Sequence, residues 1–276
     1  MSGLDPKAAG STRLKGKVCI VTGAGQGIGR AVARRLGEEG GRIVVAERVD
    51  ESASRTIDEL VKGGVTAIKA LADVSTYAGA QSLMQTALDA YGRIDVLVNN
   101  VGGTIWIQPY HEYTEEQIQL ELQRSLYTTL WCCHAVLPAM IKQNGGSIVN
   151  VGSQSPRGLY RLPYAASKGG VIAMTKVLSL EYGRYNIRVN CVSPGGTEVN
   201  DMVTTRLTLK PGEVAKAPET DKYKSYRDEM RQDIRNQQAL NRRGTPAEQA
   251  AAIAFLASDD ASFVTGDVIN CSGGQG

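Results

Sequence analysis

The first apolar stretch of the chain runs directly into a glycine-rich turn, and a helical pattern follows that turn. Residues Val18–Thr22 have the composition of a buried strand, and the turn reads Gly23-Ala-Gly25-Gln-Gly27-Ile-Gly29. Glycines let a backbone approach a ligand closely, and the N-terminus of the following helix favours negative charge. This order at the first strand predicts an α/β sheet with a pyrophosphate-binding junction.

The alternation of strands and helices continues along the chain. Further strands are predicted at 43–46, 66–71, 96–98, 147–151, 188–192 and 268–270. Helical stretches are predicted near 28–40, 51–62, 76–91, 115–142, 164–183 and 246–257, and capping-box spacing marks Thr114 and Thr245 as two helix starts. Near-continuous apolar strands between helices predict one doubly wound domain, in which a seven-stranded parallel sheet has helices on both faces.

Two segments lie outside this alternation. Residues 1–13 have no apolar core of a signal peptide, so we expect a flexible N-terminal tail before a single domain over 14–276. A long polar segment precedes the last helix, and we expect 197–245 to form a lid or substrate segment. Its ten Lys/Arg between 200 and 243 are offset by seven Asp/Glu. That balance is more typical of a solvated helix pair than of an anion-binding surface.

Composition restricts the classes of function. The net charge of +3 is too small to indicate a nucleic-acid partner, and no apolar run approaches the roughly 18 residues that a membrane span needs. The five cysteines, at positions 19, 132, 133, 191 and 271, lack the spacing of metal ligands. We therefore expect no metal site, and reduced thiols in a cytoplasmic protein.

A tyrosine, a lysine and a serine form a candidate catalytic group. Tyr164 and Lys168 are four residues apart in a predicted helix, so they share a face. A cation that close stabilises the phenolate, which can then accept a proton near neutral pH. Ser153, eleven residues before the tyrosine, could hydrogen-bond the reacting hydroxyl or carbonyl. With 11 tyrosines in the chain, however, the spacing alone is also compatible with coincidence.

An acidic residue at the end of the second predicted strand indicates the cofactor. Glu47 follows Gly29 by 18 residues. A carboxylate at this position accepts hydrogen bonds from ribose hydroxyls and repels a 2′-phosphate, which predicts NAD over NADP. Arg48 could soften that preference, and the alternative is that Glu47 only ends a strand.

Together these motifs resemble those of the short-chain dehydrogenase/reductase family over residues 14–276. Further motifs that carry the resemblance are Asp73-Val74, Asn99-Asn100-Val101-Gly102, Pro194-Gly195, Gly244-Thr-Pro-Ala-Glu248 and Phe255-Leu-Ala-Ser-Asp259. The resemblance implies a Rossmann-type fold, a nicotinamide cofactor and a homotetramer. The implied cofactor contacts are Gly23, Gln26, Gly27, Ile28, Gly29, Glu47, Asp73, Val74, Asn100, Tyr164, Lys168 and Thr197.

The resemblance also implies catalytic roles. Tyr164 would be the general base, Lys168 would hold the nicotinamide ribose and tune the tyrosine, and Ser153 would orient the substrate. Ser125 stands where the family usually has an asparagine that supports a water in the proton relay. The distance of 11 residues from Ser153 to Tyr164, where 13 is more usual, implies a shorter pocket wall.

These departures resemble a subgroup that acts on carboxylated cis-dihydrodiols. Its motifs are Asn99-Asn-Val-Gly-Gly-Thr-Ile-Trp106, Arg124-Ser-Leu and Pro194-Gly-Gly-Thr-Glu198. The implied reaction is oxidation of a 1,6-dihydroxycyclohexa-2,4-diene-1-carboxylate-type diol to a catechol with loss of CO2. The alternatives are a p-cumate dihydrodiol, another alcohol dehydrogenase or ketoreductase reaction, and redox sensing without turnover.

An anionic diene-diol substrate suggests a cation near the site. Arg157 and Arg161 lie between Ser153 and Tyr164, and a guanidinium can bind a carboxylate through two hydrogen bonds. Both arginines are also compatible with solvated loop positions. Trp106, in the loop after the fourth predicted strand, is a candidate apolar wall for the substrate ring.

Overall fold

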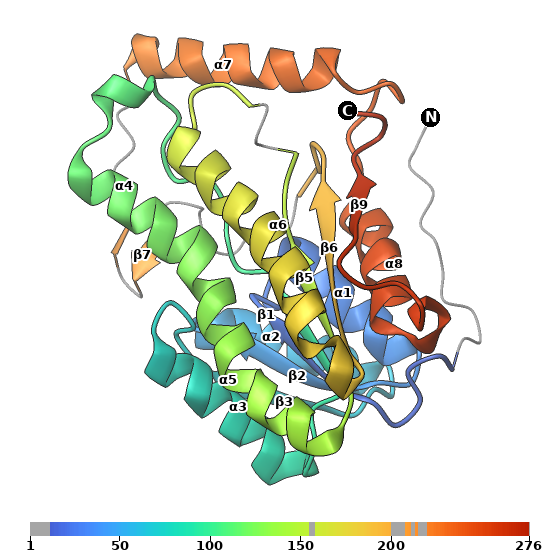
Figure 1. Ribbon diagram of the computed structural model, residues 1–276. Helices are drawn as coiled ribbons and strands as arrows, with labels where there is room; N and C mark the ends of the chain where they lie inside the picture. Colours follow the sequence, from blue (N-terminus) through green and yellow to red (C-terminus); the bar gives the residue numbers. More distant parts are fainter. Residues whose placement is uncertain (1–11, 155–157, 200–207, 211–212, 215–219, 276) are drawn as a thin grey trace.

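A seven-stranded parallel sheet forms the centre of the computed structural model, which describes residues 12–154, 158–199, 208–210, 213–214 and 220–275. Its strand order is β3-β2-β1-β4-β5-β6-β9 (Figure 1). The strands are β1 (Val18–Thr22), β2 (Arg42–Glu47), β3 (Ala67–Leu71), β4 (Val96–Asn99), β5 (Gly146–Val151), β6 (Ile187–Pro194) and β9 (Val268–Cys271). Every neighbouring pair is parallel, which confirms the predicted fold class.

Helices cover both faces of this sheet. One face carries α1 (Gly27–Glu38), α2 (Asp50–Lys62) and α8 (Pro246–Ala257), and the other carries α3 (Tyr77–Tyr91), α5 (Thr128–Gln143) and α6 (Leu162–Tyr182). In β1, Cys19 and Val21 belong to the first core, and Val18 and Ile20 belong to the second. Because both faces of the sheet are covered at its centre, β1 is buried along its whole length and is apolar up to Thr22, without alternation of apolar and polar residues.

The helix predicted over 115–142 is interrupted. The first part, α4 (Glu115–Leu122), ends in a π-helical turn over Gln123–Tyr127, and α5 begins at Thr128. The hydroxyl of Thr128 donates to the carbonyl of Arg124 at 3.1 Å. Side-chain hydroxyls of this kind compete with the regular helical hydrogen bonds, which hydrophobic periodicity alone does not reveal.

The polar segment before α8 contains a long described helix. This helix, α7 (Asp221–Asn236), lies across the edge of the sheet toward which β6 and β9 point (Figure 1). An antiparallel pair, β7 (Thr208–Lys210) and β8 (Glu213–Val214), precedes it. Residues 200–207, 211–212 and 215–219 of the predicted lid lie outside the described residues. No helix in the described part of the chain is both long and apolar enough to span a membrane.

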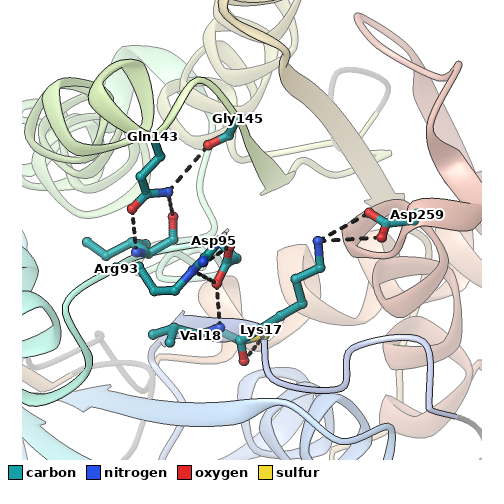
Figure 2. Close-up of polar contacts among 9 residues, drawn as sticks. Lys17, Val18, Arg93, Asp95, Gln143, Gly145 and Asp259 are labelled. Carbon is teal, nitrogen blue, oxygen red and sulfur yellow. Dashed lines mark hydrogen bonds and ion pairs between the residues drawn. The ribbon is translucent and has the colours of Figure 1, made fainter.

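Side chains connect the loops at the opposite edge, where β1 and β4 begin (Figure 2). The carboxylate of Asp95 accepts a hydrogen bond from the backbone N–H of Val18 at 2.9 Å and is paired with Arg93 at 2.6 Å. The side-chain amide of Gln143 accepts from the N–H of Ile94 at 2.9 Å and donates to its carbonyl at 2.8 Å. This edge of the sheet is therefore closed by the protein's own polar groups.

The N-terminal boundary of the domain lies slightly earlier than expected. Arg13, which the sequence places in the tail, donates to the buried carboxylate of Glu39 at 2.9 Å and pairs with Asp260 at 3.0 Å. Leu14 is fully buried in the core. The rest of the predicted tail, residues 1–11, lies outside the described residues.

Candidate active site

A cavity of about 360 Å³ lies at the carboxyl edge of the sheet, and residues of α7 form part of its lining. Ligands of open parallel sheets bind outside the carboxyl ends of the strands, where the strand order reverses, and here β1 and β4 form that reversal. The predicted site residues that line the cavity are Gly23, Gln26, Gly27, Ile28, Glu47, Asp73, Val74, Asn100, Ser153, Arg161, Tyr164, Lys168 and Thr197.

The glycine turn has the shape that a pyrophosphate requires. Gly23 has a φ of 63°, which a residue with a side chain adopts only with strain. A Cβ at Gly29 would lie 2.1 Å from the carbonyl oxygen of Gly23, so only glycine lets α1 start this close to the turn. The side chain of Asn100 donates to the carbonyl of Thr22 at 3.0 Å and fixes the turn against the end of β4. The residues present therefore fit a dinucleotide phosphate at the N-terminus of α1.

The carboxylate of Glu47 is held in place at the cavity wall. Its Oε2 accepts from the backbone N–H of Gly25 at 3.3 Å, and its Oε1 accepts from the N–H of Arg48 at 2.8 Å. Asp73 lines the same part of the cavity and accepts from the backbone N–H of Ser75 at 3.0 Å. Two acidic side chains thus lie where the resemblance places the adenosine of the cofactor.

Strand β5 and helix α6 bring three of the four predicted catalytic residues to one cavity. Tyr164 and Lys168 lie one turn apart near the start of α6, and both are buried. The ammonium of Lys168 donates to the carbonyl of Val151, the last residue of β5, at 2.7 Å. Ser153 follows two residues later and also lines the cavity. The pattern found in the sequence therefore corresponds to a spatial group.

Ser125 contacts the loop between β4 and α4, part of which lines the cavity, but Ser125 itself is not a lining residue. It is fully buried in the π-helical turn, and its Oγ accepts from the backbone N–H of Gly103 at 3.3 Å. Gly103 is one of the lining residues. The structure therefore shows that Ser125 contacts the loop between β4 and α4. Its role in the proton relay stays a prediction.

The three predicted substrate residues have different positions. Arg161 lines the cavity, with its Cζ 5.9 Å from the centre of the Tyr164 ring. Trp106 is buried in a small cluster with Ile105 and Tyr113, outside the cavity lining, because the loop turns its side chain toward α4. Its neighbour Ile105 lines the cavity in its place. Arg157 lies outside the described residues.

Helix α7 supplies apolar lining that the sequence analysis missed. Met230 and Ile234, which are nearly buried, face the cavity from this otherwise polar helix. Two apolar residues spaced four apart in a charged helix are a signal that could have identified them. The helix is attached to the rest of the protein by Tyr223, which donates to Gln108 at 2.9 Å, among other contacts.

Comparison with known proteins agrees with this geometry. A family model described as short chain dehydrogenase matches residues 17–209. The chain belongs to the short-chain dehydrogenase family. Two relatives, each named 1,6-dihydroxycyclohexa-2,4-diene-1-carboxylate dehydrogenase, come from Acinetobacter baylyi and Pseudomonas putida. They are 44% and 45% identical to this short-chain dehydrogenase over 95% of its length, and the matches cover 97% and 94% of theirs.

A solved structure shows the same fold. It comes from a Burkholderia xenovorans protein assigned to the short-chain dehydrogenase/reductases and is 34% identical in sequence. Its TM-score is 0.82, and the match covers 96% of this chain and 98% of the other. This short-chain dehydrogenase is therefore an oxidoreductase that uses a nicotinamide cofactor. The described residues contain no group of three or more side chains suited to a metal ion.

Proposed function

We propose that the enzyme oxidises a carboxylated cis-dihydrodiol of the 1,6-dihydroxycyclohexa-2,4-diene-1-carboxylate type to a catechol, with NAD as oxidant and loss of CO2, in the degradation of aromatic acids. The observation that carries this proposal is the position of Arg161. Its guanidinium lies beside the ring of Tyr164 in the cavity. A cation next to the base suits a substrate with a carboxylate on the carbon beside the reacting alcohol. The similarity to the two named relatives supports the same substrate class.

The chemistry follows from the structure of such a diol. C1 carries the carboxylate and a hydroxyl but no hydrogen, so only the secondary alcohol at C6 can be oxidised. Lys168 and Thr197, which line the cavity, would hold the nicotinamide, and the bound cofactor would supply the acceptor for the hydride of C6. The phenolate oxygen of Tyr164 accepts the proton of the C6 hydroxyl, the hydroxyl of Ser153 orients that same oxygen, and Lys168 stabilises the phenolate.

Oxidation at C6 leaves a β-keto acid. The bond from C1 to the carboxylate then breaks, and its electron pair forms the double bond between C1 and C6. The ketone oxygen takes up a proton, CO2 leaves, and the ring is aromatic. This last step needs no metal, because the adjacent ketone accepts the electron pair.

A spectrophotometric assay of NADH formation tests the substrate class. The cis-diols derived from benzoate, toluate and p-cumate are compared with cis-benzene dihydrodiol, which has the same ring and hydroxyls but no carboxylate. We expect the benzoate-type diols to have the highest kcat/KM, with one CO2 and one catechol formed per NADH. A higher kcat/KM for the p-cumate diol or for the diol without a carboxylate would contradict the proposal. Binding of NAD without turnover of any diol would favour redox sensing.

The role of Arg161 has its own test. The Arg161→Gln variant should raise KM for the carboxylated diol about 10- to 100-fold, because a charged hydrogen-bonded pair is lost. The same variant should change KM for cis-benzene dihydrodiol less than threefold. Equal losses for both substrates would show that Arg161 does not bind the carboxylate.

Glu47 supports NAD over NADP. Its carboxylate is held at the cavity wall by two backbone N–H groups, where it would repel a 2′-phosphate. We expect kcat/KM to be at least tenfold higher with NAD than with NADP. In the Glu47→Gln variant, the ratio of the two kcat/KM values should be smaller. Comparable values for the two cofactors in the unaltered enzyme would contradict this assignment.

We further propose a cytoplasmic homotetramer. The exposed apolar side chains Leu130 on α5 and Val177 and Leu180 on α6 support association, since Leu180 alone is 76% exposed. All five cysteines are free thiols, which supports a reducing compartment. Light scattering after size-exclusion chromatography should give four times the chain mass, and Leu180→Lys should lower it.

A further inference from the structure

Glu121 is a buried carboxylate that the reaction described above does not use. It lies on α4 and is fully buried. Its Oε1 accepts hydrogen bonds from the backbone N–H groups of Ile105 at 2.7 Å and Trp106 at 3.0 Å. Those groups belong to the loop between β4 and α4, and residues 102–105 of that loop line the cavity. One carboxylate oxygen therefore holds the backbone of the cavity wall.

Other side chains hold the same loop. Ser125, four residues after Glu121, accepts from the N–H of Gly103 at 3.3 Å. The hydroxyl of Tyr113 lies 2.7 Å from the carbonyl oxygen of Trp106 and 3.3 Å from that of Tyr160. Tyr160 immediately precedes Arg161, so the contacts extend from α4 through the loop to the segment that carries the candidate carboxylate ligand.

We propose that Glu121 is a positioning residue for the oxidation. It fixes the cavity wall formed by Thr104 and Ile105, against which the substrate ring lies during hydride transfer. Glu121 itself touches neither substrate nor cofactor, and it acts through the backbone of the loop. The inference rests on the proposed function in the choice of assay substrate.

The charge of Glu121 determines how firmly the loop is held. Among the described residues its Oε2 has no hydrogen-bond partner. Burial raises the pKa of Glu121 to about 7, while the two backbone N–H groups and Arg124 act in the opposite direction. The other titratable group that faces it is Tyr113, which in turn faces Tyr223 and Arg161.

The ionised carboxylate makes stronger hydrogen bonds to backbone N–H groups than the neutral acid does, but the cost of burying its charge is larger, as the raised pKa shows. Because the pKa of Glu121 is raised above its ordinary value, the group is protonated below about pH 7 and charged above it. Opening of the loop exposes Glu121 to water, where its pKa returns toward the ordinary value, so ionisation favours the open loop. The loop is therefore held less firmly as the pH rises through 7, and we expect this loss to lower kcat/KM over the same interval.

The first test compares Glu121→Gln with the unaltered enzyme in pH profiles of kcat/KM for the benzoate-type diol. Glutamine keeps the shape and one acceptor oxygen but does not ionise. We expect the step near pH 7 to disappear and kcat/KM at pH 8 to be higher than in the unaltered enzyme, because glutamine stays neutral in the buried site. Glu121→Leu removes the acceptor and should lower kcat/KM about 100-fold at every pH, since small displacements in an active site have effects of this size. Glu116→Gln, an exposed glutamate on the same helix, is the matched control and should leave the profile unchanged.

The second test needs no substrate. Hydrogen–deuterium exchange of the 103–107 segment, corrected for the intrinsic pH dependence, should show less protection at pH 8 than at pH 6 in the unaltered enzyme. Glu121→Gln should show the same protection at both values. The proposal would be overturned if the Glu121→Gln variant kept the step near pH 7. It would also be overturned if the loop were equally protected in the two proteins at pH 8. If no diol is oxidised, the proposed function fails, and the exchange measurement still decides the role of Glu121.

Discussion

The two edges of the seven-stranded sheet use their polar groups in opposite ways. At the amino edge, where the parallel strands begin, Asp95 and Gln143 form hydrogen bonds with backbone groups of Val18 and Ile94 (Figure 2). At the carboxyl edge, the glycine turn leaves its backbone beside a cavity. In a parallel sheet both edges present backbone groups that need partners. This protein closes one edge with its own side chains and keeps the other for a ligand.

This difference separates stability from function along the same strands. Strand β4 begins beside Asp95 and ends at Asn99, next to the cavity residue Asn100. Changes at its start should alter the free energy of unfolding and spare catalysis. Changes beyond its end should do the reverse.

The largest effect is expected from Tyr164→Phe at the carboxyl edge. The variant keeps the ring and loses only the hydroxyl that accepts the proton, so kcat should fall about 1,000-fold. The free energy of unfolding and the affinity for NADH should stay unchanged. Steady-state kinetics, urea unfolding and fluorescence titration measure the three quantities. Tyr182→Phe on the same helix serves as control, and a kcat within threefold of normal for Tyr164→Phe would refute its role as base.

A smaller but clear effect is expected from Asp95→Ala at the amino edge. The change leaves the buried N–H of Val18 without its acceptor and removes the partner of Arg93. The free energy of unfolding should fall by about 2–3 kcal/mol. Urea unfolding monitored by circular dichroism measures this loss, and kcat/KM at 25 °C should be unchanged. A large loss of kcat/KM in the folded variant would show that the two edges are coupled.

Glu248 refines the comparison, because it stabilises a structure at the carboxyl edge. Its carboxylate pairs with Arg242 at 2.6 Å and accepts from the N–H of Thr245 at 2.7 Å at the start of α8. The hydrogen bond from Arg242 lowers the pKa of Glu248 to about 2. A lowered pKa contributes stability above the unfolded value near 4.5, and that contribution is lost as the pH falls toward 2.

Glu248→Gln should therefore lower the free energy of unfolding by about 1 kcal/mol at pH 7, the usual size for a helix cap with a partly exposed ion pair. The difference from the unaltered enzyme should shrink below pH 4.5. Chemical unfolding at pH 7, 5 and 3.5 measures it. A difference that is constant across these values would exclude the ionised carboxylate as its source.

The smallest effect is expected from Asp259→Ala. Its carboxylate pairs with Lys17 at 3.4 Å at the amino edge, but the side chain of Asp259 is 77% exposed. An exposed pair of this kind contributes less than about 0.5 kcal/mol. Urea unfolding at low and high salt should show almost no change. A loss comparable to that of Asp95→Ala would mean that the whole edge, and not the buried carboxylate, determines stability.

The sheet was predictable from sequence because its central strands are buried on both faces. Val18–Thr22 is identical in prediction and structure, and α8 matches over 246–257. The π-helical turn was not predictable, since hydrophobic periodicity does not register one added residue. Helix α7 was missed as a bounded element because its surface is mostly charged or polar, with only Met230 and Ile234 buried.

For the site, the sequence analysis identified the candidate catalytic residues. It missed a residue that positions the backbone of the cavity wall. Tyr164, Lys168 and Ser153 stand in a recognisable pattern, and the structure brings them to one cavity. Glu121 stands in an ordinary helical sequence, and its burial depends on where the loop after β4 folds. Trp106 illustrates the same limit, because the loop backbone decides that Ile105 faces the cavity.

The π-helical turn over Gln123–Tyr127 also has a consequence for how such enzymes can diverge. A π turn accommodates one residue more than an α turn, and one residue corresponds to a rotation of about 100°. Deletion of a single residue there would give an uninterrupted helix over the same sheet. It would also turn Glu121 away from the loop between β4 and α4. A one-residue change in length can therefore alter the cavity wall formed by the loop between β4 and α4, while the sequence of the hydrophobic core stays the same.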